Sequence, residues 1–161
     1  MRSHRHRHDV VVVGARAAGA AAALLLGRFG YDVVLVDRAV FPADTVSTHQ
    51  IARTGMVQLH RWGLLQRVLD SGAPAIRQIS FTAAGESVNR PVKHKAGLDF
   101  LLAPRRYVLD TILAQAAARA GVDMRFGVTV SRVRLDDTVV SRSKGVVRLA
   151  LWAAWGAWAE R

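Results

Sequence analysis

The chain has 161 residues and no cysteine, and 23 Lys and Arg stand against 12 Asp and Glu, for a formal net charge of +11. This length suffices for one hydrophobic core, and the lack of cysteine excludes disulfides, thiolate catalysis and cysteine metal sites. No window of about 18 uncharged apolar residues occurs, so no membrane span is predicted. The apolar run after the basic N-terminus is only Val10–Val13. It is too short for a signal-peptide core, and we expect a cytoplasmic protein.

The positive charge alone would favour a nucleic-acid partner. The basic residues are scattered, however, with no interleaved aromatic residues and no recognition-helix pattern, so no specific nucleic-acid function is predicted. His4, His6 and His8 alternate with arginines, which repel a metal cation. Residues 1–8 are therefore expected to form a disordered basic arm, and no metal site is predicted.

The first elements in chain order are a strand, a tight turn and a helix. Val10–Val13 ends at Gly14, and small and apolar residues at helical spacing predict a helix over residues 16–29 that stops at Gly30. A second apolar strand is expected over residues 32–37. A unit of this kind directs the N-terminus of a helix at a phosphate group.

The turn resembles the dinucleotide fingerprint G-x-G-x-x-G, with Gly14 and Gly19 in place and Arg16 where the middle glycine is expected. Asp37 ends the second strand 23 residues after Gly14, near the spacing of a carboxylate that binds a ribose hydroxyl. The alternative is an ordinary strand-helix-strand unit in which Asp37 is only solvated.

The remaining pattern predicts an α/β fold with a mainly parallel sheet and a small antiparallel insertion. Apolar residues at helical spacing predict a further helix, which its glycines bend or break. Alternating apolar and polar residues on both sides of Ala84-Gly85 predict a hairpin. The expected segments are a helix over 49–70, strands over 76–83 and 86–92, a short apolar segment over 100–103, a helix from Pro104 to about residue 120, and strands over 122–126 and 128–135.

Five segments together resemble the N-terminal part of FAD-dependent monooxygenases of the aromatic hydroxylase type, which are related to geranylgeranyl reductases. They fit this family better than NAD-linked dehydrogenases. The resemblance implies a Rossmann-like FAD-binding domain over residues 9–135, incomplete, with the start of a substrate sheet near 76–103. The matching segments are Asp9–Gly19, Val34–Arg38, Asp44–His49, Leu59–Leu65 and Ala103–Asp110.

The same resemblance implies an oxidoreductase that uses FAD, NAD(P)H and O₂ to hydroxylate an organic substrate, aromatic or polyketide-like. It places Gly14, Ala15, Arg16, Ala17, Ala18 and Gly19 around the FAD pyrophosphate and Asp37 on the adenosine ribose. Arg38 lies over the adenine, pairs with Asp37 or is solvated. The backbone of Val130 is expected at the adenine.

Two further sites follow from the resemblance. Ser47, Thr48 and His49 are expected to contact the flavin, or else to cap the next helix. Arg106, which forms the family's Arg-x-x-Leu pattern with Leu109, is expected to contact FAD oxygens, because a guanidinium fork suits such acceptors. No catalytic residue is assigned, and Tyr107 and His94 are candidates by residue type alone.

Residues 136–161 form an atypical tail in which Trp152, Trp155 and Trp158 are spaced by three. The rest of the family's pattern, a second flavin motif and then the substrate-binding sheet, has no counterpart in this sequence. A shifted reading frame or truncated gene product is one expectation, and an amphipathic docking helix is the other. The chain alone is expected to be inactive in hydroxylation, and the alternative function is a non-catalytic FAD-binding or protein-interaction fragment that uses this tail.

Overall fold

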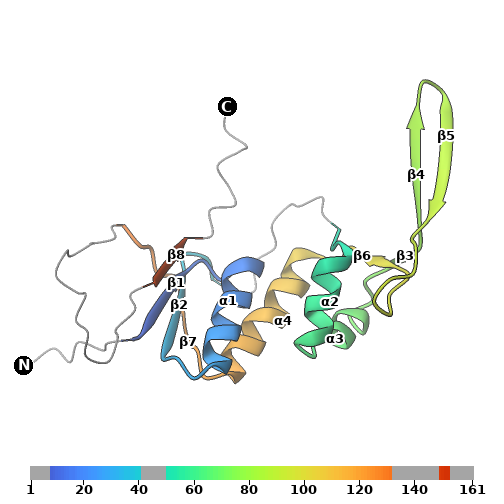
Figure 1. Ribbon diagram of the computed structural model, residues 1–161. Helices are drawn as coiled ribbons and strands as arrows, with labels where there is room; N and C mark the ends of the chain where they lie inside the picture. Colours follow the sequence, from blue (N-terminus) through green and yellow to red (C-terminus); the bar gives the residue numbers. More distant parts are fainter. Residues whose placement is uncertain (1–7, 41–49, 132–148, 153–161) are drawn as a thin grey trace, which may run out of the picture. The chain divides into compact units, whose positions relative to one another are not determined.

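The computed structural model describes residues 8–40, 50–131 and 149–152 (Figure 1). The chain divides into two compact units, one made of Met1–Ala43 with Leu113–Arg161 and the other of Asp44–Ile112.

The first unit is built on a four-stranded sheet in the order β7-β2-β1-β8. All three strand pairings are parallel, as the sequence predicts. Every residue of the central strand β2 is buried, so both faces of this strand are covered by other parts of the chain. This explains why its sequence is a continuous apolar run and does not alternate with polar residues. The strands are β1 (Val10–Val13), β2 (Val33–Asp37), β7 (Asp123–Phe126) and β8 (Leu149–Trp152).

Helix α1 (Ala17–Arg28) connects β1 to β2 and lies beside the C-terminal part of α4 (Arg106–Arg119) in Figure 1. The two approach closely at Gly27, where a Cβ atom would lie 2.8 Å from the carbonyl oxygen of Ala120. Gly30, with φ +85°, reverses the chain after α1, because this left-handed conformation is easily reached only by glycine.

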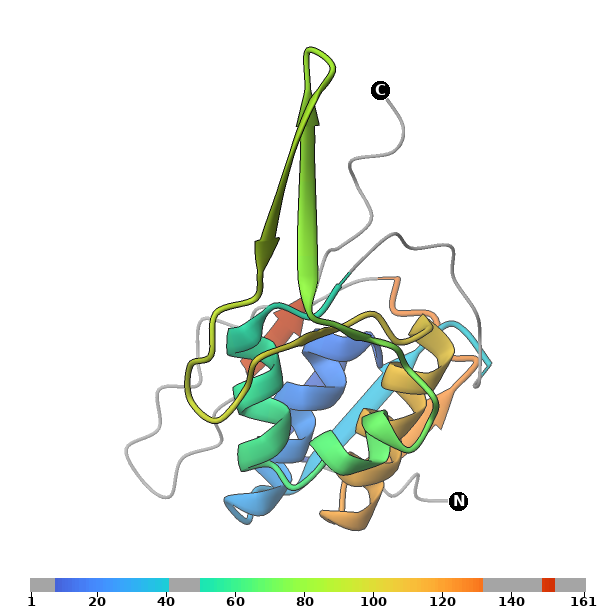
Figure 2. The ribbon, with the colours of Figure 1, turned by 90° about the vertical axis from the view of Figure 1, so that its right-hand side faces the viewer.

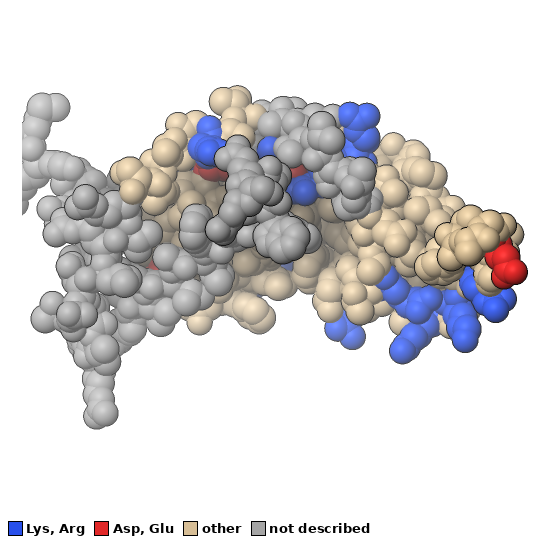
Figure 3. All heavy atoms as spheres, turned by 90° about the horizontal axis from the view of Figure 1, so that it is seen from above, with Lys and Arg blue, Asp and Glu red and all other residues tan. Residues whose placement is uncertain are grey.

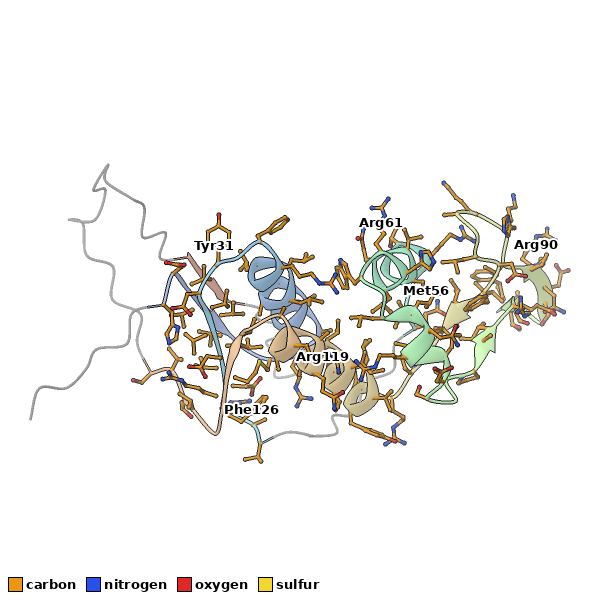
Figure 4. All side chains as sticks on the ribbon, turned by 90° about the horizontal axis from the view of Figure 1, so that it is seen from below. Tyr31, Met56, Arg61, Arg90, Arg119 and Phe126 are labelled. Carbon is orange, nitrogen blue, oxygen red and sulfur yellow. The ribbon has the colours of Figure 1, made fainter. Side chains whose placement is uncertain are left out.

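The second unit packs two short helices against a small sheet. The expected helix over 49–70 is divided into α2 (Arg53–Arg61) and α3 (Leu65–Leu69), because Gly63 between them adopts φ +74°. Strands β3 (Ala75–Ile76) and β6 (Leu101–Leu102) pair antiparallel. Met56, Val68 and Leu102 are fully buried in this unit, and Figure 4 shows Arg61 projecting from the outside of α2.

A hairpin of β4 (Gln78–Ala83) and β5 (Glu86–Pro91) extends from the second unit (Figure 2). Its turn is Ala84-Gly85, as predicted, with φ of 52° and 84°. Positive φ at both central residues defines the type I′ turn, whose twist suits a two-residue hairpin. The prediction of a small antiparallel insertion is confirmed by this hairpin and by the β3-β6 pair.

Two sequence expectations differ from the structure. Residues 128–131 do not continue as a strand, and the rest of the expected strand over 128–135 lies outside the described residues. Trp152 lies in β8, paired to Val13 of β1, and not in an amphipathic helix, while Trp155 and Trp158 lie outside the described residues. A strand that adds to a parallel sheet alternates its side chains, so a three-residue spacing does not define one face there.

Of the arm expected over residues 1–8, only His8 is described, and its side chain is 15% exposed. Its Nδ1 lies 3.0 Å from a carboxylate oxygen of Asp32, the residue before β2. The backbone N–H of Asp32 in turn donates to the Asp9 carboxylate at 2.9 Å. His8 therefore belongs to the folded edge of the first unit, because Asp32 offers it a hydrogen-bond partner.

Candidate functional site

The turn between β1 and α1 has a geometry that only glycine permits at two positions. Gly14 adopts φ +99°, and its N–H donates to the carbonyl of Val36 at 2.8 Å. At Gly19 a Cβ atom would lie 1.8 Å from the carbonyl oxygen of Gly14 and 3.3 Å from a methyl of Val12. The N-terminus of α1 therefore lies against the end of β1. Gly14 is required for its positive φ, and Gly19 is required for the close approach of the helix to the strand.

The first turn of α1 carries no acidic side chain of its own. The N-cap residue of this helix is Arg16, which makes no side-chain cap hydrogen bond. The first intrahelical hydrogen bond in this turn runs from the N–H of Ala20 to the carbonyl of Arg16, so the N–H groups of Ala17, Ala18 and Gly19 precede the helical ladder. Such donors, together with the helix dipole, favour an anion at this position.

Asp37, the last residue of β2, is 7% exposed and holds the turn from the other side. One carboxylate oxygen accepts from the N–H of Ala15 at 2.6 Å, and the other accepts from the N–H of Ala39 at 2.8 Å. Each oxygen has a second lone pair, so the carboxylate can still accept hydroxyl groups of a ligand. The Asp37 side chain is therefore buried and fixed in the turn by two hydrogen bonds, and it is not solvated.

Arg38 and the segment that leads to Val130 both adjoin Asp37. Arg38 is exposed, and within the described part of the chain it forms no ion pair with Asp37. The N–H of Val128 donates to the carbonyl of Asp37 at 2.9 Å, which places the segment that leads to Val130 beside the end of β2. Val130 itself is 40% exposed. The structure thus brings Gly14–Gly19, Asp37, Arg38 and the Val130 segment together in the first unit.

Arg106, at the start of α4, belongs to the second unit. Its Nη2 lies 3.3 and 3.4 Å from the two carboxylate oxygens of Asp110, which is fully buried. The Nε of Arg106 is buried and has no hydrogen-bond partner among the described residues. Sequence reasoning missed Asp110 as a partner, although its position four residues after Arg106 on a helix is the signal for such a pair.

The other sequence candidates belong to the second unit or lie outside the described residues. Ser47, Thr48 and His49 lie outside the described residues. His94 and Tyr107 are both exposed, and the guanidinium of Arg105 lies 5.7 Å from the centre of the Tyr107 ring. In residues 8–40, 50–131 and 149–152, no group of three His, Cys, Asp or Glu side chains is arranged to hold a metal ion. No helix in these ranges is long and apolar enough to cross a membrane.

The donor set at the turn fits the adenylate end of a dinucleotide. Backbone N–H groups and the helix dipole suit a pyrophosphate, the missing Cβ at Gly19 permits the close strand-helix approach, and the buried carboxylate suits a ribose diol. The buried Nε of Arg106, which has no partner among the described residues, is a donor that fits an oxygen acceptor.

Comparison with known proteins identifies the class. The chain belongs to the FAD binding domain family, whose sequence profile matches residues 7–146. The cofactor of this family is FAD, as the sequence resemblance implies, and the α/β fold with its parallel sheet is the fold expected of it.

The chain is similar to two curated oxidoreductases and to a solved flavoprotein. The chain is 34% identical over 136 residues to a menaquinone reductase of Mycolicibacterium smegmatis, covering 82% of this chain and 32% of the relative. It is 29% identical over 156 residues to a kynurenine 3-monooxygenase of Salinispora arenicola, covering 91% and 32%. A solved flavoprotein/dehydrogenase from Cytophaga hutchinsonii superposes with a TM-score of 0.72 at 27% identity, covering 81% and 33%. The chain therefore spans about a third of the length of these relatives.

Proposed function

We propose that this chain binds the adenylate end of FAD at the β1-α1 turn, as the cofactor-binding part of an FAD-dependent oxidoreductase. The observation that carries the proposal is the buried Asp37 carboxylate fixed to the N–H of Ala15 at 2.6 Å, beside an α1 N-terminus without an acidic residue. One acceptor and several backbone donors are thereby held at fixed positions before any ligand arrives.

Each residue at the site makes its own contribution to FAD binding. The backbone N–H groups from Ala15 to Gly19 donate to the pyrophosphate, and Arg16 adds positive charge near it. Asp37 accepts the ribose hydroxyls, and Arg38 and the backbone at Val130 border the adenine. Ser47, Thr48 and His49 contact the flavin side, and Arg106 donates to FAD oxygens through its fork of N–H groups.

FAD, when bound, supplies the electron transfer that the side chains of this chain cannot perform. The residues described here bind and orient the adenylate end of the cofactor, and no acid or base among them is assigned a proton-transfer role. In the parent activity we propose, NAD(P)H and O₂ are the co-substrates and an organic molecule, aromatic or polyketide-like, is hydroxylated. The 29% identity to a kynurenine 3-monooxygenase supports this reaction class.

A reductase is the second candidate function, and the 34% identity to a menaquinone reductase favours it. It agrees with the proposed kinship to geranylgeranyl reductases. The two candidates differ in the use of O₂. An FAD-loaded protein that reduces a quinone or a prenyl chain without incorporating oxygen is a reductase, whereas oxygen from ¹⁸O₂ in the product identifies a hydroxylase.

The proposed binding is tested by titrating the purified chain with FAD and following flavin fluorescence, with circular dichroism to show that the protein is folded. Saturation at micromolar FAD is expected. Calorimetric titration with FAD and with NAD separates a flavoprotein from an NAD-linked dehydrogenase. A folded chain without a saturable change would overturn the proposal.

We further propose that these 161 residues alone do not hydroxylate a substrate. The described binding groups serve the adenylate end of FAD, and a hydroxylation site also needs an enclosure that excludes water from the reactive ring. NAD(P)H consumption with added FAD, followed by product analysis on phenols and polycyclic aromatics, tests this. A hydroxylated product at enzyme-like turnover would contradict the proposal.

A further inference from the structure

The β4-β5 hairpin presents an unpaired edge whose sequence is complementary to itself. The two strands form a sheet of their own, and no third strand pairs with either edge within the described residues (Figure 2). All residues of β5 are exposed, and an isolated two-stranded hairpin is at best marginally stable in water. An exposed edge of this kind is a template for a further strand.

The hydrogen-bond pattern fixes which β5 groups face outward. Val92 donates its N–H to the carbonyl of Arg77 at 2.8 Å, so these opposed residues form a hydrogen-bonded pair. Hydrogen-bonded and non-hydrogen-bonded pairs alternate along an antiparallel ladder, and therefore Val88 and Phe81, which are opposed, also form a hydrogen-bonded pair. The N–H and C=O groups of Ser87 and Asn89 consequently point away from β4.

The side chains of β5 divide between two faces. Glu86, Val88 and Arg90 share one face with Phe81, and Ser87 and Asn89 lie on the other. On the second face Ser87 bonds to Thr82 at 2.7 Å and Asn89 bonds to Ser80 at 2.6 Å. On the first face Phe81 is 64% exposed and Val88 is 44% exposed, so an apolar row lies open there.

We propose that β5 pairs antiparallel with β5 of a second copy of this chain, about a two-fold axis at Val88. Ser87 then opposes Asn89 of the other copy, and their outward backbone groups exchange hydrogen bonds on both sides of the axis. Val88 opposes its own counterpart, and the two hairpins form a four-stranded sheet with a continuous row of Phe81 and Val88 side chains.

The charges select this register. Glu86 and Arg90 are each two residues from Val88, so each opposes the other residue of the second copy at close, non-hydrogen-bonded positions. A shift of the axis to Glu86 or to Arg90 would oppose like charges. Neither side chain forms an ion pair within the described part of the chain.

The charge of the whole chain does not prevent the contact. The net charge of +11 is distributed over the entire sequence, whereas Gln78–Pro91 contains one acidic and one basic side chain and is neutral. Figure 3 shows Lys and Arg side chains gathered to one side of the hairpin, with an acidic side chain at its end. At physiological salt, charges more than about 8 Å apart are largely screened.

Crosslinking tests the axis directly, because the chain contains no cysteine. Val88→Cys introduces one thiol that opposes its counterpart across the axis, so mild oxidation is expected to give a disulfide-linked dimer. Ser87→Cys opposes Asn89 instead, and Thr82→Cys lies on β4, so both are matched controls that crosslink much more slowly. Equal rates for the three variants, each folded by circular dichroism, would overturn the proposal.

Charge reversal tests the register. Sedimentation of the unmodified chain is expected to show a concentration-dependent dimer, and a monomer at all concentrations would overturn the proposal. Glu86→Arg or Arg90→Glu alone is expected to weaken the dimer about ten-fold or more, because each variant opposes like charges twice. The double variant is expected to restore self-association, and an equimolar mixture of the two single variants is expected to form a mixed dimer.

The exposed Arg61→Glu on α2 is the matched control for the change in net charge, and it is expected to leave the dimer unchanged. Single reversals that associate as the unmodified chain does would contradict the register. So would a double variant that associates no better than the single ones. These outcomes do not depend on FAD, so they are distinct from a failure of the proposed cofactor binding.

Discussion

The carboxylate of Asp37 accepts a hydrogen bond from the backbone N–H of Ala15 at 2.6 Å, across 22 residues of sequence. This contact joins the end of β2 to the turn that follows β1, and it is buried. A residue identified for its spacing from a glycine motif therefore also fixes the conformation of that motif. Asp37 has a structural task before any ligand is considered.

We expect Asp37→Ala to lower both stability and FAD affinity. The substitution leaves the N–H groups of Ala15 and Ala39 without their acceptor, which costs about 1–3 kcal/mol for a buried donor. FAD affinity is expected to fall about ten-fold or more, since about 1.4 kcal/mol corresponds to a factor of ten. Urea unfolding and fluorescence titration measure the two effects. Asp70→Ala, at an exposed position after α3, is the control, and an FAD affinity that stays unchanged in Asp37→Ala removes this residue from the site.

Gly19→Ala is expected to destabilise the first unit even though alanine is the better helix former. The new Cβ would lie 1.8 Å from the backbone oxygen of Gly14, so the helix must move away from the strand. Overpacking of this kind costs about 1–3 kcal/mol or more, which exceeds the gain of about 1 kcal/mol in helix propensity.

Gly55→Ala in α2 is the matched control for this prediction, measured by the same urea unfolding. Its Cβ would meet only a methyl group of the Ile51 side chain, at 2.8 Å, and no backbone atom. Gly55→Ala is expected to change stability by less than Gly19→Ala. Equal effects at the two positions would show that the close approach at Gly19 is not what requires glycine.

The sequence predicts the first unit well because its signals are local. Val10–Val13, Gly14 and Asp37 specify a strand, a turn and a second strand through short-range pattern, and the structure has each of them. The division of the 49–70 helix depends on Gly63, which local pattern marks only as a bend or a break.

Features that depend on tertiary pairing were missed. Strand β8 exists through its ladder with β1, and the sequence from Leu149 to Trp152 carries no turn signal that separates a strand from a helix. The burial of Asp110 is likewise a property of the packed unit, since an isolated helix would leave this carboxylate solvated.

Arg106 and Asp110 provide a test that separates folding from cofactor binding. Arg106→Met is expected to lower stability by up to about 3–5 kcal/mol, because it removes the Arg106 guanidinium from the buried Asp110 carboxylate. The double variant Arg106→Met, Asp110→Asn removes both charges and is expected to recover much of this stability. FAD affinity is expected to stay reduced in the double variant, since the proposed donor is still absent. Full recovery of FAD affinity together with stability would show that Arg106 has only a structural role.

Ala84→Asn is expected to stabilise the hairpin. Ala84 adopts φ +52°, a left-handed conformation that costs a residue with a Cβ about 1–2 kcal/mol, whereas Asn-Gly is a preferred pair for a type I′ turn. The hairpin forms a separate two-stranded sheet. The substitution is therefore expected to raise the free energy of local opening of the hairpin and not the free energy of global unfolding. The measurement is amide hydrogen exchange at Phe81 and Val88, whose protection is expected to rise about five-fold for a gain of about 1 kcal/mol. Ala83→Asn, in the strand beside the turn, is expected to lower protection, because asparagine is unfavourable in an extended strand. Unchanged or lower protection in Ala84→Asn would contradict the assignment of this turn.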